Sequence, residues 1–432
     1  MAMLPSTTYR SKRQRIVAVL DMGTSKVCCL IARAAPAPDW LGEQGPATQY
    51  QVIGIGHQRA LGMKSGTVVH MDLAEQAIRS AVDQAELMAG VTVENVLLGV
   101  TCGRISSESF QASVAIESAG VRGADIDRVL AAGRDYATRE GRTLLHALAT
   151  GCHLDGGTKI SDPCGMIADR LQVDIHSVAA DEAPLRNLML CVERCHLEVA
   201  GLAAAPYASA IATLTPDEAK LGATCIDIGA GTTTIAVFAD GEFILADALA
   251  MGGHLITLDL AHAFSTPLED AERIKTLYAS AYPTPSDERE VVALPMVGDD
   301  DLPQHNNTTK AQIAEIIRPR MEEIFIQVRD RLTAKGLGGS GSPRVVLTGG
   351  ASQLPGLGDL AANILDAEVR LGRPRGVAGL PGTADPAFAA AVGLLIFSDR
   401  FAAETAFRIE EPALATGTGY LARVGQWIRE SF

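Results

Sequence analysis

The sequence predicts an α/β fold of two similar lobes, each with a mixed β-sheet and flanking helices. A strand, a glycine-rich turn and a second strand occur twice, about 200 residues apart, and each first strand ends in an aspartate. Apolar runs typical of strands are interleaved with segments of helical periodicity, as in layered α/β domains. The chain of 432 residues is long enough for about two to four domain-sized units. We interpret the repeat as an internal duplication.

The composition is that of a globular, acidic protein. Hydrophobic residues make up 47% of the chain, charged residues make up 20%, and the net charge is -14. Because phosphate groups bind to positive surface, this charge argues against nucleic acid as a partner. No apolar run predicts a transmembrane helix, and the basic tail at 1–15 leads into a strand-like segment, unlike a signal peptide. Eight cysteines without Cys-x2-Cys spacing indicate reduced thiols in the cytoplasm.

The repeated unit is a β-hairpin. In the first copy, RIVAVLD ends at Asp21, the turn MGTSK follows, and a second apolar run begins at Val27. In the second copy, ATCIDIG contains Asp227 and leads into AGTTT and a further apolar run. A short turn rich in glycine between two apolar runs is typical of a hairpin. Asp21 and Asp227 hold matching positions in the two copies.

Capping signals place two of the longer helices. We expect one helix to start at Asp72 with Glu75 as its capping-box partner, and to end at Gly90. Thr309 and Gln312 form the same pair at the start of a second helix. Further strands are expected at 94–101, 197–203 and 345–347, and further helices at 206–214, 268–278 and 387–397.

The two turns are the main candidate site. A tight turn of this kind points several backbone N–H groups into one concavity, which binds anions. Two such turns across a cleft would hold a polyphosphate, Asp21 and Asp227 would hold magnesium through water, and Lys26 would neutralise phosphate charge. One turn alone would be an ordinary hairpin, but two copies make coincidence a poor explanation. The candidate residues are Asp21, Gly23, Thr24, Ser25, Lys26, Asp227, Gly229, Gly231, Thr232 and Thr233.

Two further motifs would complete a nucleotide site. In LTGGASQLPGL, a strand runs into Gly349 and Gly350, which allow a flat ring or a phosphate to approach the backbone, and Ser352 follows. In LEDAERIKTLY, Glu272 and Lys275 lie one helical turn apart and would face the ribose hydroxyls. Each motif also has a plainer interpretation, a strand–helix turn in the first case and a solvated ion pair in the second.

These motifs carry a resemblance. DMGTSK, IDIGAGTTT, AERIK and LTGGASQLPG together resemble the superfamily of actin, sugar kinases and heat-shock-chaperone ATPases. More narrowly, GVTCGRISS, SDPCGMIADRLQVDIHSV, CVERCHLEVAGL, TPLEDAERIKTLYASA and IIRPRMEEIF resemble the bacterial FtsA family of cell-division proteins, almost end to end. The resemblance implies a two-lobed actin-like (ribonuclease H-like) ATPase fold, in which a differently placed inserted subdomain replaces the smaller subdomain of the first lobe.

The resemblance also implies a division into domains. The first lobe would have its core at 16–89, 173–215 and 378–400, with the inserted subdomain at 90–172. The second lobe would have its core at 216–252 and 336–377, with a small subdomain at 253–335. A linker at 401–419 would lead to an amphipathic helix at 420–432.

Function follows from the same resemblance. FtsA proteins tether FtsZ filaments to the inner membrane and recruit later division proteins, so we expect ATP and magnesium as cofactors, self-assembly into a filament, and a location on the cytoplasmic face of the inner membrane at midcell. The inserted subdomain would bind later division proteins. The small subdomain would bind the C-terminal peptide of FtsZ, with Arg318 and Arg320 as candidates because arginine pairs well with carboxylates.

One departure from the family pattern concerns hydrolysis. Several bacterial relatives place a glutamate before a proline in the interlobe helix, where it orients the attacking water. Here Ala204 and Ala205 precede Pro206. Because a water-positioning carboxylate is missing, we expect at most slow ATP hydrolysis, with nucleotide acting mainly as a ligand for assembly.

The last residues predict a membrane anchor. On a helical wheel, the apolar residues gather within an arc of about 140°, and polar residues occupy the other side. This geometry is typical of a helix that lies in the membrane interface. The alternative is a helix that docks on the protein's own second lobe. The apolar residues are Tyr420, Leu421, Val424, Trp427, Ile428 and Phe432.

Other members of the superfamily remain as competing interpretations. A sugar or acetate kinase needs a catalytic carboxylate in the cleft and a sugar-binding lobe, and we find neither. A chaperone-type ATPase needs a peptide-binding domain after the second lobe, for which too few residues remain. An FtsA-like ATPase of pilus assembly is the main alternative, and the terminal amphipathic segment argues against it.

Overall fold

Two mixed β-sheets form the framework of the protein. The computed structural model describes residues 15–37, 48–297, 305–337, 344–380 and 385–406. The first sheet contains, in spatial order, β10 (Glu198–Ala204), β6 (Asn95–Val100), β1 (Arg15–Met22), β2 (Lys26–Pro36), β3 (Thr48–Arg59) and β18 (Val377–Ala378). The second contains β17 (Glu368–Leu371), β16 (Arg344–Thr348), β11 (Ala223–Ile228), β12 (Thr233–Ala239), β13 (Glu242–Leu249), β7 (Ser106–Ala115), β9 (Arg170–Asp181) and β8 (Arg142–Leu154).

The two sheets repeat one topology. In the first, β1, β2 and β3 are antiparallel, and β6 and β10 follow β1 on its other side as parallel strands. In the second, β11, β12 and β13 are antiparallel, and β16 and β17 follow β11 in the same way. The strand order is therefore the one that an internal duplication predicts, and both duplicated turns lie at the same place in it.

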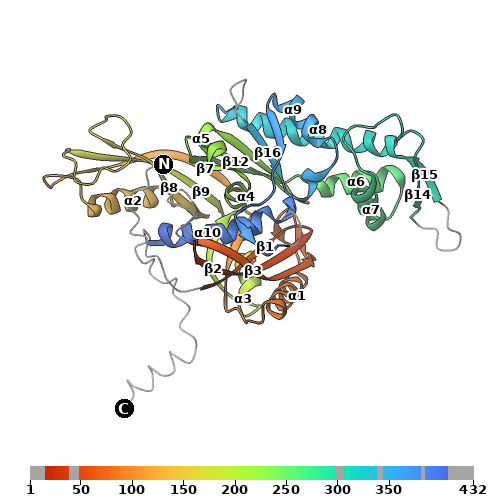
Figure 1. Ribbon diagram of the computed structural model, residues 1–432, viewed down its shortest axis with the longest axis horizontal. Coiled ribbons are helices and arrows are strands. Elements are labelled where there is room, and N and C mark those ends of the chain that lie inside the picture. Colours follow the sequence, from red (N-terminus) through yellow and green to blue (C-terminus); the bar gives the residue numbers. More distant parts are fainter. Residues whose placement is uncertain (1–14, 38–47, 298–304, 338–343, 381–384, 407–432) are drawn as a thin grey trace, which may run out of the picture.

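Helices cover the sheets and fill the space between the lobes. Figure 1 shows α4 and α10 in the middle of the molecule, the inserted strands at one end and α6 to α8 at the other. The helices are α1 (Met71–Ala89), α2 (Gly123–Ala137), α3 (Glu182–Glu193), α4 (Ala205–Thr213), α5 (Pro216–Leu221), α6 (Gly253–Phe264), α7 (Leu268–Tyr278), α8 (Lys310–Ala334), α9 (Leu357–Leu365) and α10 (Ala389–Ala406). Shorter elements are β4 (Met63–Lys64), β5 (Thr67–Val68), β14 (Val291–Pro295), β15 (His305–Thr309), η2 (Gly350–Gln353) and η3 (Pro386–Phe388).

The capping signals are right for one helix, and for the other they are right at its C-terminal end, where Gly90 is the left-handed cap, and wrong at its N-terminal end. Thr309 caps α8 and exchanges hydrogen bonds with Gln312, which confirms the predicted capping box. Helix α1 begins one residue earlier than expected, so Asp72 lies inside its first turn and no side chain caps the helix. The carboxylate of Glu75 pairs instead with Arg194, the C-terminal cap of the neighbouring helix α3, at 2.9 Å. A tertiary ion pair has thus replaced the local cap.

Three hydrophobic cores support the architecture. One lies around β1, β2 and α1 and reaches α4 and α10. A second lies around β11, β12, α6 and α8. A third, smaller core lies between α2 and the strands β8 and β9 of the inserted region. Consecutive residues of β1 and β2 are buried, so the first core includes both faces of its sheet, and helices pack against each of the three cores.

The inserted region contacts both lobes. The chain leaves the first sheet after β6 and returns to that lobe with α3. Its strand β7, however, joins the second sheet, where Ser106 pairs with Asp247 of β13. Next to this pair, the hydroxyl of Ser107 accepts a 2.8 Å hydrogen bond from the amide of Ala246. The insertion is therefore covalently part of one lobe and hydrogen-bonded to the other.

The ends of the chain are described only in part. Helix α10 continues to Ala406, so it includes the first residues of the expected linker at 401–419. Most of the basic tail, the rest of the expected linker and the segment at 420–432, which was predicted to be an amphipathic helix, lie outside the described residues. Among the helices that the structure describes, none has the length and apolar character needed to cross a membrane.

Candidate functional site

A cavity of about 800 Å³ opens between the lobes, where β1 and β11 end. Elements that are far apart in the sequence contribute its walls, since the two turns, α7 and the segment after β16 all reach it. It brings together most of the residues predicted for a nucleotide site. These are Asp21, Gly23, Thr24, Ser25, Lys26, Asp227, Gly229, Thr232, Glu272, Lys275, Gly349 and Gly350.

The two turns have matching backbones. The amide of Gly23 donates to the carbonyl oxygen of Lys26 at 2.9 Å, and the amide of Gly229 donates to that of Thr232 at 2.8 Å. Each bond closes a turn directly after the strand that carries the aspartate. The remaining amides of such a turn are free to point toward an anion.

The turns also touch each other across the cleft. A Cβ atom on Gly231 would lie 2.4 Å from Oγ1 of Thr24, closer than any side chain can approach. The Thr24 hydroxyl is itself fixed, because it accepts a 2.9 Å hydrogen bond from the amide of Gly66. Gly231 is thus needed for the contact between the turns, although it does not line the cavity.

Strand alternation separates the threonines of the second turn. Thr232 and Thr234 line the cavity, whereas Thr233 is buried and donates to the carbonyl oxygen of Met251 at 2.9 Å. Ser352 is also buried, and its hydroxyl bonds to the carbonyl oxygen of Gly349 at 2.7 Å. The structure therefore places Thr233 and Ser352 in the scaffold behind the cavity and not on its wall.

The two carboxylates lie in a setting that favours a bound cation. Burial raises the pKa of Asp21 to about 6, with the charge of Lys26 opposing the shift and that of Asp227 adding to it. Burial also raises the pKa of Asp227, against the effects of a hydrogen bond from Ser209 and of the Lys26 charge. A cation would relieve both the desolvation and the mutual repulsion. Carboxylates are the ligands that magnesium prefers, so the pair fits this ion.

Lys26 is held at the edge of the cavity by the segment before α10. Its Nζ donates a hydrogen bond to the carbonyl oxygen of Ala387 and lies 4.5 Å from the centre of the Phe388 ring. Both contacts come from the end of η3. The ammonium group is therefore placed between the first turn and the start of α10, where it faces the two carboxylates.

The Gly-Gly segment leaves space for a ligand. Gly349 has φ 85°, and a Cβ atom there would lie 2.2 Å from Oδ1 of Asp227. Only glycine fits this conformation and this contact. At Gly350, the nearest atom to an added Cβ is the Cβ of Ala387, at 3.8 Å. A ligand can therefore approach the backbone of Gly350 directly.

Glu272 and Lys275 form more than a solvated ion pair. Nζ of Lys275 donates to Oε2 of Glu272 at 2.6 Å, to Oγ1 of Thr257 at 2.9 Å and to the carbonyl oxygen of Gly253 at 3.1 Å. Burial raises the pKa of Glu272, but the hydrogen bonds from Lys275 and Thr257 outweigh it and leave the pKa lowered. The pair is thus anchored to α6, with Glu272 still exposed to a ligand in the cleft.

Several residues that line the cavity were not predicted from the sequence. His57, Gln58 and Arg59 lie at the end of β3, and Thr101 follows β6. Thr234 lies opposite Asp227 in the strand register, and its buried hydroxyl has no hydrogen-bond partner in the described part of the protein. A buried polar atom without a partner is costly, so this hydroxyl fits an oxygen-rich ligand. Strand alternation from Thr232 was the signal that would have found it.

The start of α4 lacks a carboxylate. Ala205 lines the cavity at the first residue of this helix, which connects the lobes. Among the described lining residues, the carboxylates are Asp21, Asp227 and Glu272. The first two belong to the turns and the third is tied to Lys275.

The arginines predicted to bind a partner already have carboxylate partners in the chain. Arg318 pairs with Glu322 at 2.7 Å and stacks on the ring of Tyr282, 4.9 Å from its centre. Arg320 binds Asp259 of α6 through two hydrogen bonds of 2.7 and 3.0 Å. Arg318 is the more exposed of the two and does not connect α8 to α6.

Comparisons with known proteins agree on one family. A family model described as "Cell division protein FtsA" matches residues 224–393, and a model of the SHS2 domain inserted in FtsA matches residues 102–179. The FtsA protein of Agrobacterium fabrum is 44% identical over 427 residues, which covers 98% of this chain and 96% of the relative. The FtsA protein of Escherichia coli K12 is 30% identical over 427 residues, covering 97% of this chain and 99% of the relative.

Solved structures of distant proteins share the fold. The PilM–PilN type IV pilus biogenesis complex matches with a TM-score of 0.59 and 18% identity, over 90% of this chain and 99% of the other. MreB5 of Spiroplasma citri bound to ADP matches with a TM-score of 0.53 and 13% identity, over 92% of this chain and 99% of the other. These likenesses confirm the predicted two-lobed actin-like fold.

Proposed function

The chain belongs to the FtsA family of cell-division proteins, and from that premise we propose that it binds ATP with magnesium, assembles into filaments on the inner membrane and anchors FtsZ filaments there. In this proposal the inserted subdomain recruits later division proteins. The observation that carries the nucleotide part is the pair of matching turns that meet across one cavity. The solved neighbour MreB5, which shares the fold and was bound to ADP, supports a nucleotide as the ligand.

Different residues of the cleft would bind different parts of the nucleotide. The amides of the two turns and the Lys26 ammonium would bind the phosphates, and Asp21 and Asp227 would hold magnesium through its waters. Glu272 and Lys275 would bind the ribose hydroxyls, while the backbone at Gly349 and Gly350 would lie against the adenosine. The ligand would bridge the lobes and so favour the closed form that assembles.

Titration calorimetry tests nucleotide binding. The wild-type protein is expected to bind Mg-ATP, and Gly350→Leu to bind it at least roughly tenfold more weakly, because the new side chain occupies ligand space. Gly358→Leu is the matched control, since an added Cβ at Gly358 of α9 meets nothing within 4 Å. An unaltered affinity in Gly350→Leu would place the nucleotide elsewhere, and no binding by the wild type would contradict the proposal.

Hydrolysis is expected to be slow. Ala205 stands where a water-positioning carboxylate would lie, and the loss of such a group costs about two to four orders of magnitude in rate. Nucleotide would then act mainly as an assembly ligand. Steady-state phosphate release measures this directly, and turnover on the order of 10 per second, as in a median enzyme, would refute it.

The subdomain at 253–335 is proposed to bind the C-terminal peptide of FtsZ. Arg318 is the better candidate, because a peptide carboxylate could replace Glu322 without separating α8 from α6. Arg318→Glu should weaken binding of a labelled peptide at least roughly tenfold in fluorescence anisotropy. Arg329→Glu, another exposed arginine of α8, is the control and should bind normally. If both variants bind equally well, the peptide site lies elsewhere.

The segment at 420–432 is proposed to be the membrane anchor. A single amphipathic helix binds membranes weakly and reversibly, so stable attachment would require several anchors along a filament. In vesicle flotation, the wild type should float with anionic liposomes, whereas Trp427→Glu should not, because it places a charge in the apolar arc. Equal behaviour of the two proteins would exclude this segment as the anchor.

Imaging distinguishes division from pilus assembly. A fluorescent fusion expressed in dividing cells should form a band at midcell. Deletion of residues 420–432 should disperse the band through the cytoplasm. A wild-type fusion that forms no midcell band would contradict the division role and favour the pilus-assembly alternative.

A further inference from the structure

Helix α4 carries a serine whose hydroxyl is directed at the second of the two cleft carboxylates. Ser209 is 1% exposed, and its Oγ donates a hydrogen bond to Oδ2 of Asp227. A serine or threonine inside a helix ordinarily bonds back to a carbonyl one turn earlier. Thr213 does so, with Oγ1 2.7 Å from the carbonyl oxygen of Ser209. Ser209 instead reaches from α4 to the end of β11, so its bond connects the interlobe helix to the site.

Asp227 is confined on its other side by Gly349, the residue that follows the neighbouring strand β16. A Cβ on Gly349 would lie 2.2 Å from Oδ1 of Asp227, so the absence of a side chain at Gly349 leaves the space that this oxygen occupies. The carboxylate is therefore hydrogen-bonded through Oδ2 and enclosed at Oδ1. Within the described ranges, Asp21 receives no side-chain hydrogen bond of this kind.

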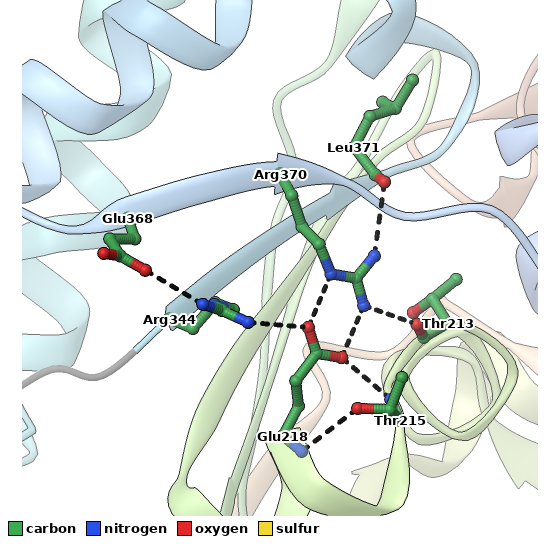
Figure 2. A network of polar contacts seen from close by, with 7 residues as sticks. All are labelled: Thr213, Thr215, Glu218, Arg344, Glu368, Arg370 and Leu371. Carbon is green, nitrogen blue, oxygen red and sulfur yellow. Dashed lines mark hydrogen bonds and ion pairs between the residues drawn. The ribbon is translucent and has the colours of Figure 1, made fainter.

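The C-terminal end of α4 is fixed to the same sheet by the network in Figure 2. Arg370 of β17 donates to the carbonyl oxygen of Thr213 at 2.9 Å and to Glu218 through two bonds of 2.6 Å. Glu218 also forms a capping box with Thr215 and pairs with Arg344 of β16 at 3.7 Å. Because β11, β16 and β17 are neighbours in one sheet, α4 cannot slide along β11 without breaking this network.

We propose that Ser209 is a positioning residue, which holds the Asp227 carboxylate in the orientation that receives hydrated magnesium together with the nucleotide. The inference rests on the proposed function and adds a residue to that site. Magnesium keeps several of its waters and requires near-octahedral geometry, so a carboxylate that binds it through water must be well oriented. Loss of the Ser209 hydroxyl should therefore weaken binding of Mg-ATP and leave binding of metal-free ATP little changed.

The test compares calorimetric titrations of the full-length protein with ATP in magnesium and with ATP in EDTA. Ser209→Ala is expected to bind Mg-ATP roughly tenfold more weakly, as for a lost hydrogen bond to a charged group. Ser209→Cys has nearly the same shape and a weaker donor, so its affinity for Mg-ATP should fall between those of the other two proteins. Should Ser209→Ala fail to fold, Ser209→Cys decides the question by the same comparison.

Thr213→Val is the matched control. It removes a second buried hydroxyl from α4, one turn away, whose contacts are the Ser209 carbonyl oxygen and Sγ of Cys225 and not a carboxylate. It should keep the magnesium dependence of the wild type. Equal weakening by Ser209→Ala in magnesium and in EDTA, or no weakening in magnesium, overturns the inference. If the wild type binds ATP under neither condition, the proposed nucleotide site fails, and the inference fails with it.

Discussion

The two cleft turns share a backbone and differ in what surrounds their carboxylates. In both, an amide after the aspartate strand closes the turn on a carbonyl three residues later. The Asp21 carboxylate is influenced by the positive charge of Lys26, a residue of its own turn whose ammonium group is bonded to η3. The Asp227 carboxylate accepts a hydrogen bond from a hydroxyl of α4 and lies against Gly349, which has no side chain. The two copies thus share the path of the backbone. The first turn supplies a positive charge beside its carboxylate, whereas the surroundings of the second turn fix the orientation of its carboxylate.

The strongest test of this difference is Gly349→Val. The new Cβ would meet Oδ1 of Asp227 at 2.2 Å and the carbonyl oxygen of Ile228 at 2.6 Å, at a φ of 85°. Overpacking and a left-handed backbone together should cost about 3 to 5 kcal/mol of folding free energy, measured by urea unfolding. Gly358→Val, in open space on α9, should change stability little. A fully stable Gly349→Val protein would contradict the confinement of Asp227.

A second test concerns the network of Glu218 and Arg370, which lies outside the cleft and fixes the C-terminal end of α4 to the sheet that carries the second turn. Hydrogen bonds from Arg370 lower the pKa of Glu218 to about 2, against burial and with help from Thr215. A lowered pKa stabilises the fold fully above the ordinary value near 4.5, and this contribution is lost as the pH falls from there to about 2. At neutral pH, Glu218→Gln should therefore cost about 2 to 3 kcal/mol.

The measurement is urea unfolding of the wild type and Glu218→Gln at several pH values. The stability difference between them should be constant at pH 7 and 6 and should shrink below about pH 4.5. Glu368→Gln is a suitable control, because this glutamate is exposed and pairs with Arg344 at the rim of the same network. A difference that grows on acidification would have the wrong sign and would refute the assignment.

A third test compares equivalent positions of the two turns. Lys26 of the first turn corresponds to Thr232 of the second, since each accepts the hydrogen bond that closes its turn. Lys26→Met should lower the affinity for Mg-ATP by roughly 10- to 100-fold, as expected for a lost charged hydrogen bond. Thr232→Val should have a much smaller effect. Equal losses in calorimetry would mean that charge is not the particular contribution of the first turn.

The smallest expected effect concerns the contact between the turns. Gly231→Ala would place a Cβ 2.4 Å from Oγ1 of Thr24, so the turns must separate slightly. We expect roughly a fivefold loss of Mg-ATP affinity, about 1 kcal/mol. Thr24→Ala should restore part of this loss in the double variant, which a double-mutant cycle would detect as coupling. Strictly additive effects would argue against a direct contact.

The sequence was sufficient to predict the duplicated part of the fold. Both hairpins, their aspartates and the parallel strands beside them repeat, and the sequence motif repeats with them. Strand alternation could also have separated Thr232 and Thr234 from Thr233, because successive side chains point to opposite faces. That rule was available in the sequence, but Thr233 was predicted to contact the ligand and Thr234 was not.

Other parts of the site depend on tertiary packing. Ser209 lies in a helix of alanines, and nothing in its neighbourhood indicates that β11 passes beside it. His57 and Arg59 reach the cavity only because β3 ends next to the first turn. The start of α1 was misplaced for a related reason, since Glu75 pairs with Arg194 at the end of α3 and not with a group at the start of its own helix. Contacts between distant elements leave no local pattern.

The order of the strands has a consequence for synthesis of the protein. The first sheet is completed by β18, where Val377 pairs with Tyr50 of β3, and its inner face is covered by α10, which begins at Ala389. A chain that emerges from the ribosome N-terminus first must therefore carry an open edge and an uncovered apolar face until nearly all of it has been translated. The lobe that is translated first can be closed only by the last helix of the described fold.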